Sequence, residues 1–84
     1  MARVFEKGFW IVTIDESKNM LQVEYDDIYH RHPFRMSLEE ARDMPPEELI
    51  RYIQDNTFDF PPKENGTWNT LLNLIMKLRD DKIL

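Results

Sequence analysis

The stretch FWIVTIDESKNMLQVEY, residues 9–25, decides the fold of this 84-residue chain. Its first part, 9–14, contains only aromatic and β-branched residues, which favour extended backbone. Its last part, 20–25, alternates so that Leu21, Val23 and Tyr25 share one face. The polar residues between the two parts are typical of a turn. The stretch therefore predicts a β-hairpin, around which an antiparallel sheet can form.

A third strand is predicted after the hairpin, over residues 28–36. Asp26 and Asp27 supply a turn, and the residues that follow alternate between two faces. One face carries Ile28, His30, His32, Phe34 and Met36, and the other carries Tyr29, Arg31 and Arg35. Because Pro33 has no N–H to donate to a central strand, we expect this strand at an edge of the sheet.

Two short helices are predicted next. Ser37 and Glu40 have capping-box spacing, in which the Ser37 hydroxyl accepts a hydrogen bond from the Glu40 N–H and the Glu40 carboxylate accepts one from the Ser37 N–H. A helix should therefore begin at this point and end before Pro45. Pro46 suits the first turn of a second helix, where its missing N–H removes no helical hydrogen bond.

A final helix is predicted from an N-cap at Thr67, after a loop over 56–66 that Phe58 and Phe60 should pin to the body. Its apolar residues recur at helical spacing and should form the core: Trp68, Leu71, Leu72, Ile75 and Leu78. Leu74 and Met76 lie off this stripe. Exposure of both would indicate a second apolar face and self-association.

These elements predict an α+β fold in which a three-stranded antiparallel sheet is followed by two or three helices packed on one face. A chain of this length buries a single core, so residues 1–84 should form one small globular domain. There is no cysteine, and no apolar run is long enough for a signal segment or a membrane span. We therefore expect a cytoplasmic protein that does not bind membranes and is a monomer or a weak homodimer.

The net charge of -5 comes from the segment 37–66, which holds eight acids and three bases. Such an asymmetry, interleaved with aromatic residues, favours a surface that binds a basic partner protein. The predicted partner-binding residues are Glu39, Glu40, Asp43, Glu47, Glu48, Tyr52, Asp55 and Asp59. We expect a protein-binding domain without catalysis or a cofactor, acting as a regulator, adaptor or accessory subunit of a larger complex.

Three alternative functions are considered, and each depends on other residues or on another kind of partner. The acids could replace phosphates in a virus- or mobile-element-encoded inhibitor of a nucleic-acid-binding protein. His30 and His32 could supply two ligands of a minimal metal site, although no further ligand has a distinctive spacing. Tyr29, Arg31 and Arg35 form a strip that could stack on and pair with RNA. The few bases and adjacent acids disfavour this, and we expect no direct binding of nucleic acid.

Catalytic patterns are weaker still. Glu24, Asp26 and Asp27 cluster in a predicted turn, where carboxylates are normally solvated and do not act as general acids or bases. No serine or threonine lies in a nucleophile-elbow motif. The two glycines, Gly8 and Gly66, stand apart from any phosphate-binding loop. No stretch carries a motif that is specific to one protein family.

Overall fold

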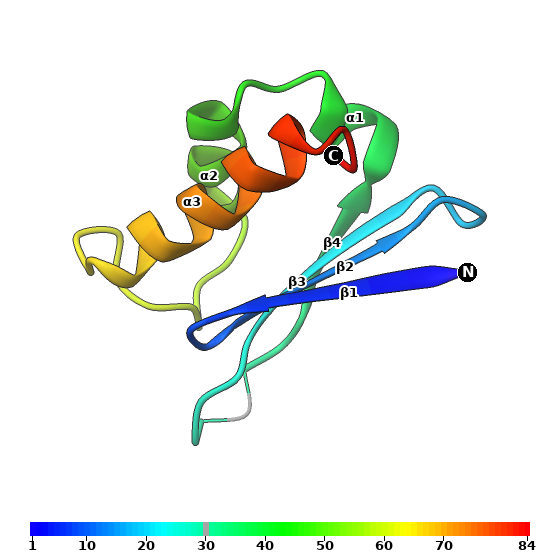
Figure 1. Ribbon diagram of the computed structural model, residues 1–84. Helices are drawn as coiled ribbons and strands as arrows, with labels where there is room; N and C mark the ends of the chain where they lie inside the picture. The colour runs from blue at the N-terminus through cyan, green and yellow to red at the C-terminus, as the bar shows by residue number, and fades with distance from the viewer. Residues whose placement is uncertain (30) are drawn as a thin grey trace.

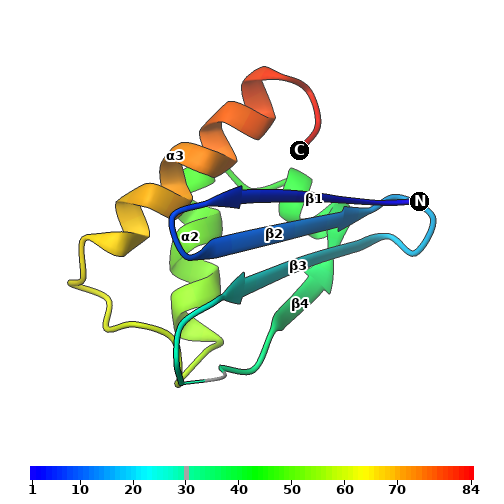
Figure 2. The same ribbon diagram turned by 60° about the horizontal axis from the view of Figure 1, so that its bottom comes forward.

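The computed structural model describes every residue except His30 and has an α+β architecture in two layers (Figure 1). Its antiparallel sheet contains four strands in chain order: β1 (Ala2–Lys7), β2 (Trp10–Asp15), β3 (Met20–Tyr25) and β4 (Phe34–Ser37). Three helices follow: α1 (Leu38–Arg42), α2 (Pro46–Asp55) and α3 (Thr67–Asp80). The helices lie on one side of the sheet, and no described element covers its other face (Figures 1 and 2).

The structure confirms the predicted hairpin but corrects the number of strands from three to four. β1 pairs with β2 from Ala2 opposite Asp15 to Lys7 opposite Trp10. Gly8 begins the two-residue turn with φ of 59°, a left-handed conformation that glycine adopts without a steric penalty. β1 lacks a sequence signal because it is an edge strand whose residues are exposed, except for the half-buried Phe5.

The third predicted strand is shorter than expected. Of the described residues between 28 and 36, only Phe34 to Met36 are in the sheet, where β4 pairs with β3 and forms the predicted edge. The Asp27 carboxylate accepts a hydrogen bond from the Tyr29 N–H at 3.0 Å, which bends the chain after β3. Pro33 immediately precedes β4 and restricts pairing further back. His30 lies outside the described residues.

The core lies between the sheet and the helices. Alternate residues of β2 and β3 point toward α2 and α3, as the period of two residues in a strand requires. The buried residues on this sheet face are Trp10, Val12, Ile14, Leu21, Val23 and Phe34. The helices contribute Leu38, Ala41, Leu49, Ile50, Ile53, Trp68, Leu71, Leu74, Ile75 and Leu78. Because Leu74 is buried, the condition for a second apolar face on α3, exposure of both Leu74 and Met76, is not met.

Side chains that come before α1 and α3 in the chain accept hydrogen bonds from the first N–H groups of these two helices. The Ser37 hydroxyl accepts from the Glu40 N–H at 3.3 Å, as predicted, and the Asn19 Oδ1 accepts from the Glu39 N–H at 3.0 Å. The final helix corrects the predicted cap, because Thr67 is its first residue and Gly66 is the N-cap. The Asn65 Oδ1 accepts from the Thr67 N–H at 2.9 Å and so satisfies a free donor at this helix start.

The chain after α3 folds back onto the core. Lys82 has φ of 59°, and the Ile83 N–H donates to the Leu78 carbonyl at 2.8 Å. This hydrogen bond and this backbone conformation form a Schellman motif, a helix C-terminus in which the left-handed residue is usually glycine. The side chain of Leu84 is then buried. No helix in the described part of the chain is both long and apolar enough to cross a membrane.

Replacing Lys82 with glycine is expected to raise the free energy of unfolding by about 0.5–1 kcal/mol, because the left-handed backbone strains any residue that has a Cβ. Urea denaturation of the wild type and the variant measures this difference. Lys82→Ala is the control, since it removes the charge but keeps the Cβ. An equal gain in Lys82→Ala would show that charge, and not backbone strain, limits stability at this position.

Candidate functional site

Five exposed carboxylates lie on α1, at its C-cap and in the first turn of α2. We call this set the acidic patch: Glu39, Glu40, Asp43, Glu47 and Glu48. In the part of the chain that the structure describes, none of the five forms an ion pair. The short α1 and the immediate start of α2 at Pro46 place all five within ten residues of one another. Their charges are therefore available to a partner.

The nearest base on α1 is already engaged elsewhere. Arg42 donates to both carboxylate oxygens of Glu16 at 3.0 and 2.6 Å, and also to the Ile83 carbonyl at 3.0 Å. The hydrogen bond from Arg42 holds the pKa of Glu16 below its ordinary value, although partial burial opposes this shift. Because Arg42 is committed to the β2–β3 turn and the end of the chain, it does not neutralise the acidic patch.

The other three predicted partner-binding residues lie toward or beyond the opposite end of α2. Asp55 pairs with Lys63 at 2.8 Å, and Asp59 contacts His32. Tyr52 is half-buried, with its ring edge-to-face against Phe34. Tyr52 and Asp55 follow Glu48 at helical spacing, so α2 carries these three residues along one side, and its two ends are about 15 Å apart. We call Tyr52, Asp55 and Asp59 the second group.

A surface depression of 340 Å³ lies beside this second group, between the chain before β4 and the end of α2. His32 and Asp59 meet at its edge: the Asp59 carboxylate accepts from the His32 N–H at 2.9 Å and lies 3.0 Å from the His32 Nδ1. The backbone hydrogen bond from His32 is the main cause of the lowered pKa of Asp59. This contact ties the 56–66 loop to the chain before β4.

The two phenylalanines of that loop have different roles. Phe60 is buried against Trp10 and Trp68, so it pins the loop as predicted. Phe58 is 95% exposed and lines the depression, so the prediction that it also pins the loop was wrong. The two residues have similar neighbours in the sequence, and no local pattern distinguishes the buried ring from the exposed one.

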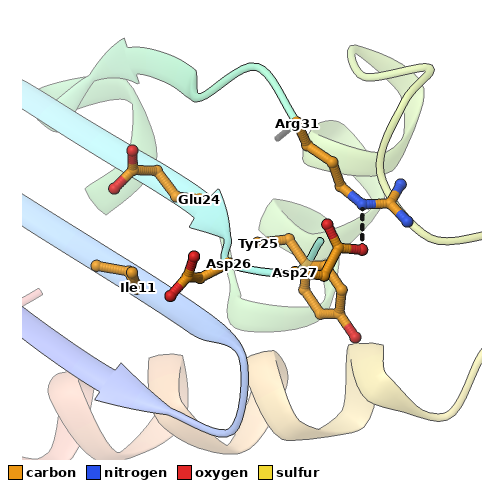
Figure 3. A pocket seen from close by; sticks show the side chains of 6 residues that line it. All are labelled: Ile11, Glu24, Tyr25, Asp26, Asp27 and Arg31. Atoms are coloured by element: carbon orange, nitrogen blue, oxygen red, sulfur yellow. Dashed lines mark hydrogen bonds and ion pairs between the residues drawn. The ribbon is translucent and has the colours of Figure 1, made fainter. Parts of the chain in front are cut away.

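The cluster of Glu24, Asp26 and Asp27 lines another depression, of 240 Å³, at the end of β3 (Figure 3). Arg31 donates from Nε to the Asp27 carboxylate at 2.9 Å, whereas the carboxylates of Glu24 and Asp26 point away from it (Figure 3). Burial raises the pKa of Asp27, but hydrogen bonds from Arg31 and Tyr29 outweigh it and leave the pKa below its ordinary value. A general acid near neutral pH requires the opposite shift.

The predicted basic strip is not assembled on one strand. Arg31 lies before β4, and its guanidinium stacks over the rings of Tyr25 and Tyr29 at 5.4 and 5.5 Å. Arg35 lies in β4 and donates to the Gln22 side chain at 2.7 Å. Because Arg31 already has a carboxylate and two aromatic partners, it helps to hold the loop before β4 rather than presenting a free cation.

The predicted histidine metal site falls partly outside the described residues, because it includes His30. The side chain of His32 is 88% exposed and contacts one carboxylate, that of Asp59. Within the residues that the structure describes, no group of three His, Asp or Glu side chains is arranged to hold a metal ion. A complete ligand set therefore does not form around His32 from the described residues.

The fold and surface define a small two-layer α+β protein whose acidic patch lies on α1, its C-cap and the first turn of α2. In comparisons with protein-family models, curated proteins and solved structures, no match to this chain was found. Inferences about function therefore depend on the surface of this chain itself.

Proposed function

We propose that this protein is a small non-enzymatic protein-binding domain, and that its acidic patch binds a basic surface of a partner protein. In this role it would act as a regulator, adaptor or accessory subunit. The observation that carries the proposal is the set of five exposed carboxylates without an ion pair in the described chain. Clustered charges of one sign accelerate association with an oppositely charged surface and fix its orientation.

Helix stability alone explains only part of the acidic patch. Glu39 and Glu40 lie in the first turn of α1, and Glu47 and Glu48 in the first turn of α2, where each acid stabilises a helix by about 0.3–1 kcal/mol. Asp43 is different, because it is the C-cap of α1 and faces the negative end of the helix dipole. A carboxylate at that position opposes helix stability, which supports a role for the patch in binding.

The partner determines which of two functions the patch serves. A basic protein that binds no nucleic acid would indicate an adaptor or accessory subunit. A nucleic-acid-binding protein whose ligand competes with this chain would instead indicate an inhibitor that replaces phosphates with carboxylates. The five carboxylates of the acidic patch, which form no ion pair in the described chain, suit either function. Asp55 and Asp59 contribute less to a binding surface, because each already contacts a basic side chain.

Charge reversal in the double variant Glu47→Lys/Glu48→Lys is expected to weaken partner binding by at least about tenfold, because both charges are exposed and turn from attractive to repulsive. The partner is first captured from native lysate at low and moderate salt and identified by mass spectrometry. Affinities of the purified partner are then measured for the wild type and the variant. The free energy of unfolding should change by no more than about 2 kcal/mol.

The matched control is Asp26→Lys/Asp80→Lys, which changes the net charge equally at two exposed acids outside the acidic patch. This control should retain most of the affinity. Equal weakening in both double variants would show that net charge, and not the patch, governs binding. If no basic protein is captured by the wild type at either salt concentration, the proposed function is contradicted.

A further inference from the structure

β1 presents a free strand edge. It is the first strand of the sheet, and in the described chain no strand lies on its outer side. Its six residues contain no proline, and their pairing with β2 runs without a bulge. The opposite edge, β4, has four residues and follows Pro33. Proteins usually block free edges with prolines, bulges, covering segments or charged side chains; β1 contains no proline or bulge, and its charged residues are Arg3, Glu6 and Lys7.

The direction of the free backbone groups follows from the hydrogen bonds of β2. The Phe9 carbonyl accepts from the Asp26 N–H, so Ile11 and Thr13, two and four residues further on, also bond toward β3. The alternate residues of β2 are Trp10, Val12 and Ile14. They bond toward β1, where their partners are Lys7, Phe5 and Arg3. The N–H and C=O groups of Ala2, Val4 and Glu6 therefore point outward from the sheet.

Apolar surface surrounds this edge. Val4 is 59% exposed on the sheet face that no described helix covers. On the helix side, a groove of 520 Å³ runs between β1 and the end of α3, with apolar walls from Phe5, Leu74, Leu78 and Ile83. Glu6, Lys7, Lys77 and Asp81 also line it, two acids and two bases. The groove thus carries balanced charge, unlike the acidic patch.

We propose that β1 pairs antiparallel with β1 of a second copy of this chain, about a two-fold axis at Val4. The two four-stranded sheets then join into one. Each outward-facing residue meets an outward-facing residue: Val4 lies opposite Val4, and Ala2 lies opposite Glu6. Arg3 lies opposite Phe5, a contact that already forms within one chain, where the Arg3 guanidinium lies 5.4 Å from the Phe5 ring centre.

Among the registers with the two-fold axis at Arg3, Val4 or Phe5, only the one at Val4 places no like-charged side chains of β1 opposite each other. Cross-strand neighbours must lie on the same face, so the alternative registers shift the two-fold axis by one residue. An axis at Arg3 places the two arginines opposite each other, and an axis at Phe5 places Arg3 opposite Lys7.

The first test is disulfide cross-linking, because the chain has no cysteine of its own. Opposite residues of an antiparallel pair have Cα atoms about 5 Å apart, so Val4→Cys should give a cross-linked dimer under mild oxidation. Thr13→Cys is the control, since Thr13 is the direct neighbour of Val4 on β2. Three strand spacings of about 4.8 Å separate the two Thr13 positions, which is too far for a disulfide.

We expect dimer formation in Val4→Cys to be at least tenfold faster than in Thr13→Cys. Equal rates would overturn the proposal. The second test is light scattering with size-exclusion chromatography over a range of concentrations. Val4→Lys places two cations opposite each other and should raise the dimer dissociation constant at least tenfold, whereas Val4→Thr should preserve the dimer. Circular dichroism verifies that both variants fold.

Two further outcomes would also overturn self-pairing. A wild type that stays monomeric at the highest soluble concentration would leave β1 unpaired or available to a strand of a different protein. A dimer that Val4→Lys does not weaken would use another surface. These results are independent of the proposed function, because Val4 lies outside the acidic patch and Glu47→Lys/Glu48→Lys leaves β1 unchanged.

Discussion

Replacing Trp10 with alanine is expected to lower the free energy of unfolding by about 3–5 kcal/mol, because the change opens a cavity at the centre of the core. Trp10 has no exposed surface. Its ring contacts those of Tyr25, Phe60 and Trp68, with centroids 4.7, 5.7 and 4.8 Å away. Its indole Nε1 also donates to the Thr67 carbonyl at 2.8 Å and so fastens the start of α3 to β2.

Urea denaturation followed by the fluorescence of the remaining Trp68 measures this loss. Natural domains of this kind are stable by only about 5–15 kcal/mol, so Trp10→Ala removes a large share of the total. Trp10→Phe keeps most of the ring and should cost about 1–3 kcal/mol, which remains measurable if the alanine variant does not fold. Phe9→Ala, at an exposed neighbouring ring, is the control. A loss below 1 kcal/mol in Trp10→Ala would contradict the central role of this side chain.

Replacing Arg79 with methionine is expected to lower the free energy of unfolding by about 2–3 kcal/mol, because two carbonyls lose a charged donor. One guanidinium nitrogen of Arg79, Nη2, donates to the carbonyls of Ala41 and Met44, each at 2.7 Å. These carbonyls belong to the end of α1 and the segment that leads to α2. Arg79 therefore ties α3 to the short α1, which is too short to be stable by itself.

Lys77→Met is the matched control, since Lys77 is an exposed base on the same helix and forms an ion pair with Asp81, the C-cap of α3. It should change the free energy of unfolding by less than about 1 kcal/mol. Hydrogen exchange adds a local readout, because the amides of α1 should lose protection in Arg79→Met before those of α3 do. Equal stability losses in the two variants would indicate that removal of charge, and not the loss of the link to α1, is responsible.

Local patterns predicted the central hairpin, the Ser37 cap and the apolar stripe of α3, because each arises from neighbours in the chain. β1 was not predicted, because its residues form no such local pattern. An edge strand buries little, so Phe5 has no alternating apolar neighbours that would reveal it. The predicted strand over 28–36 had the right alternation, but Pro33 and the hydrogen bond from the Tyr29 N–H to Asp27 restrict pairing to its last residues.

The candidate site also combines features that can be predicted from the sequence with features that depend on the fold. Composition alone shows that the negative charge of this protein concentrates in residues 37–66, since composition does not depend on folding. Which of those acids have an ion-pair partner among the described residues depends on the tertiary structure. Arg42 turns to Glu16, Lys63 to Asp55 and His32 to Asp59, each across a separation that no local pattern encodes. The pairing of charges depends on distances in space, and these are set by how the helices pack on the sheet.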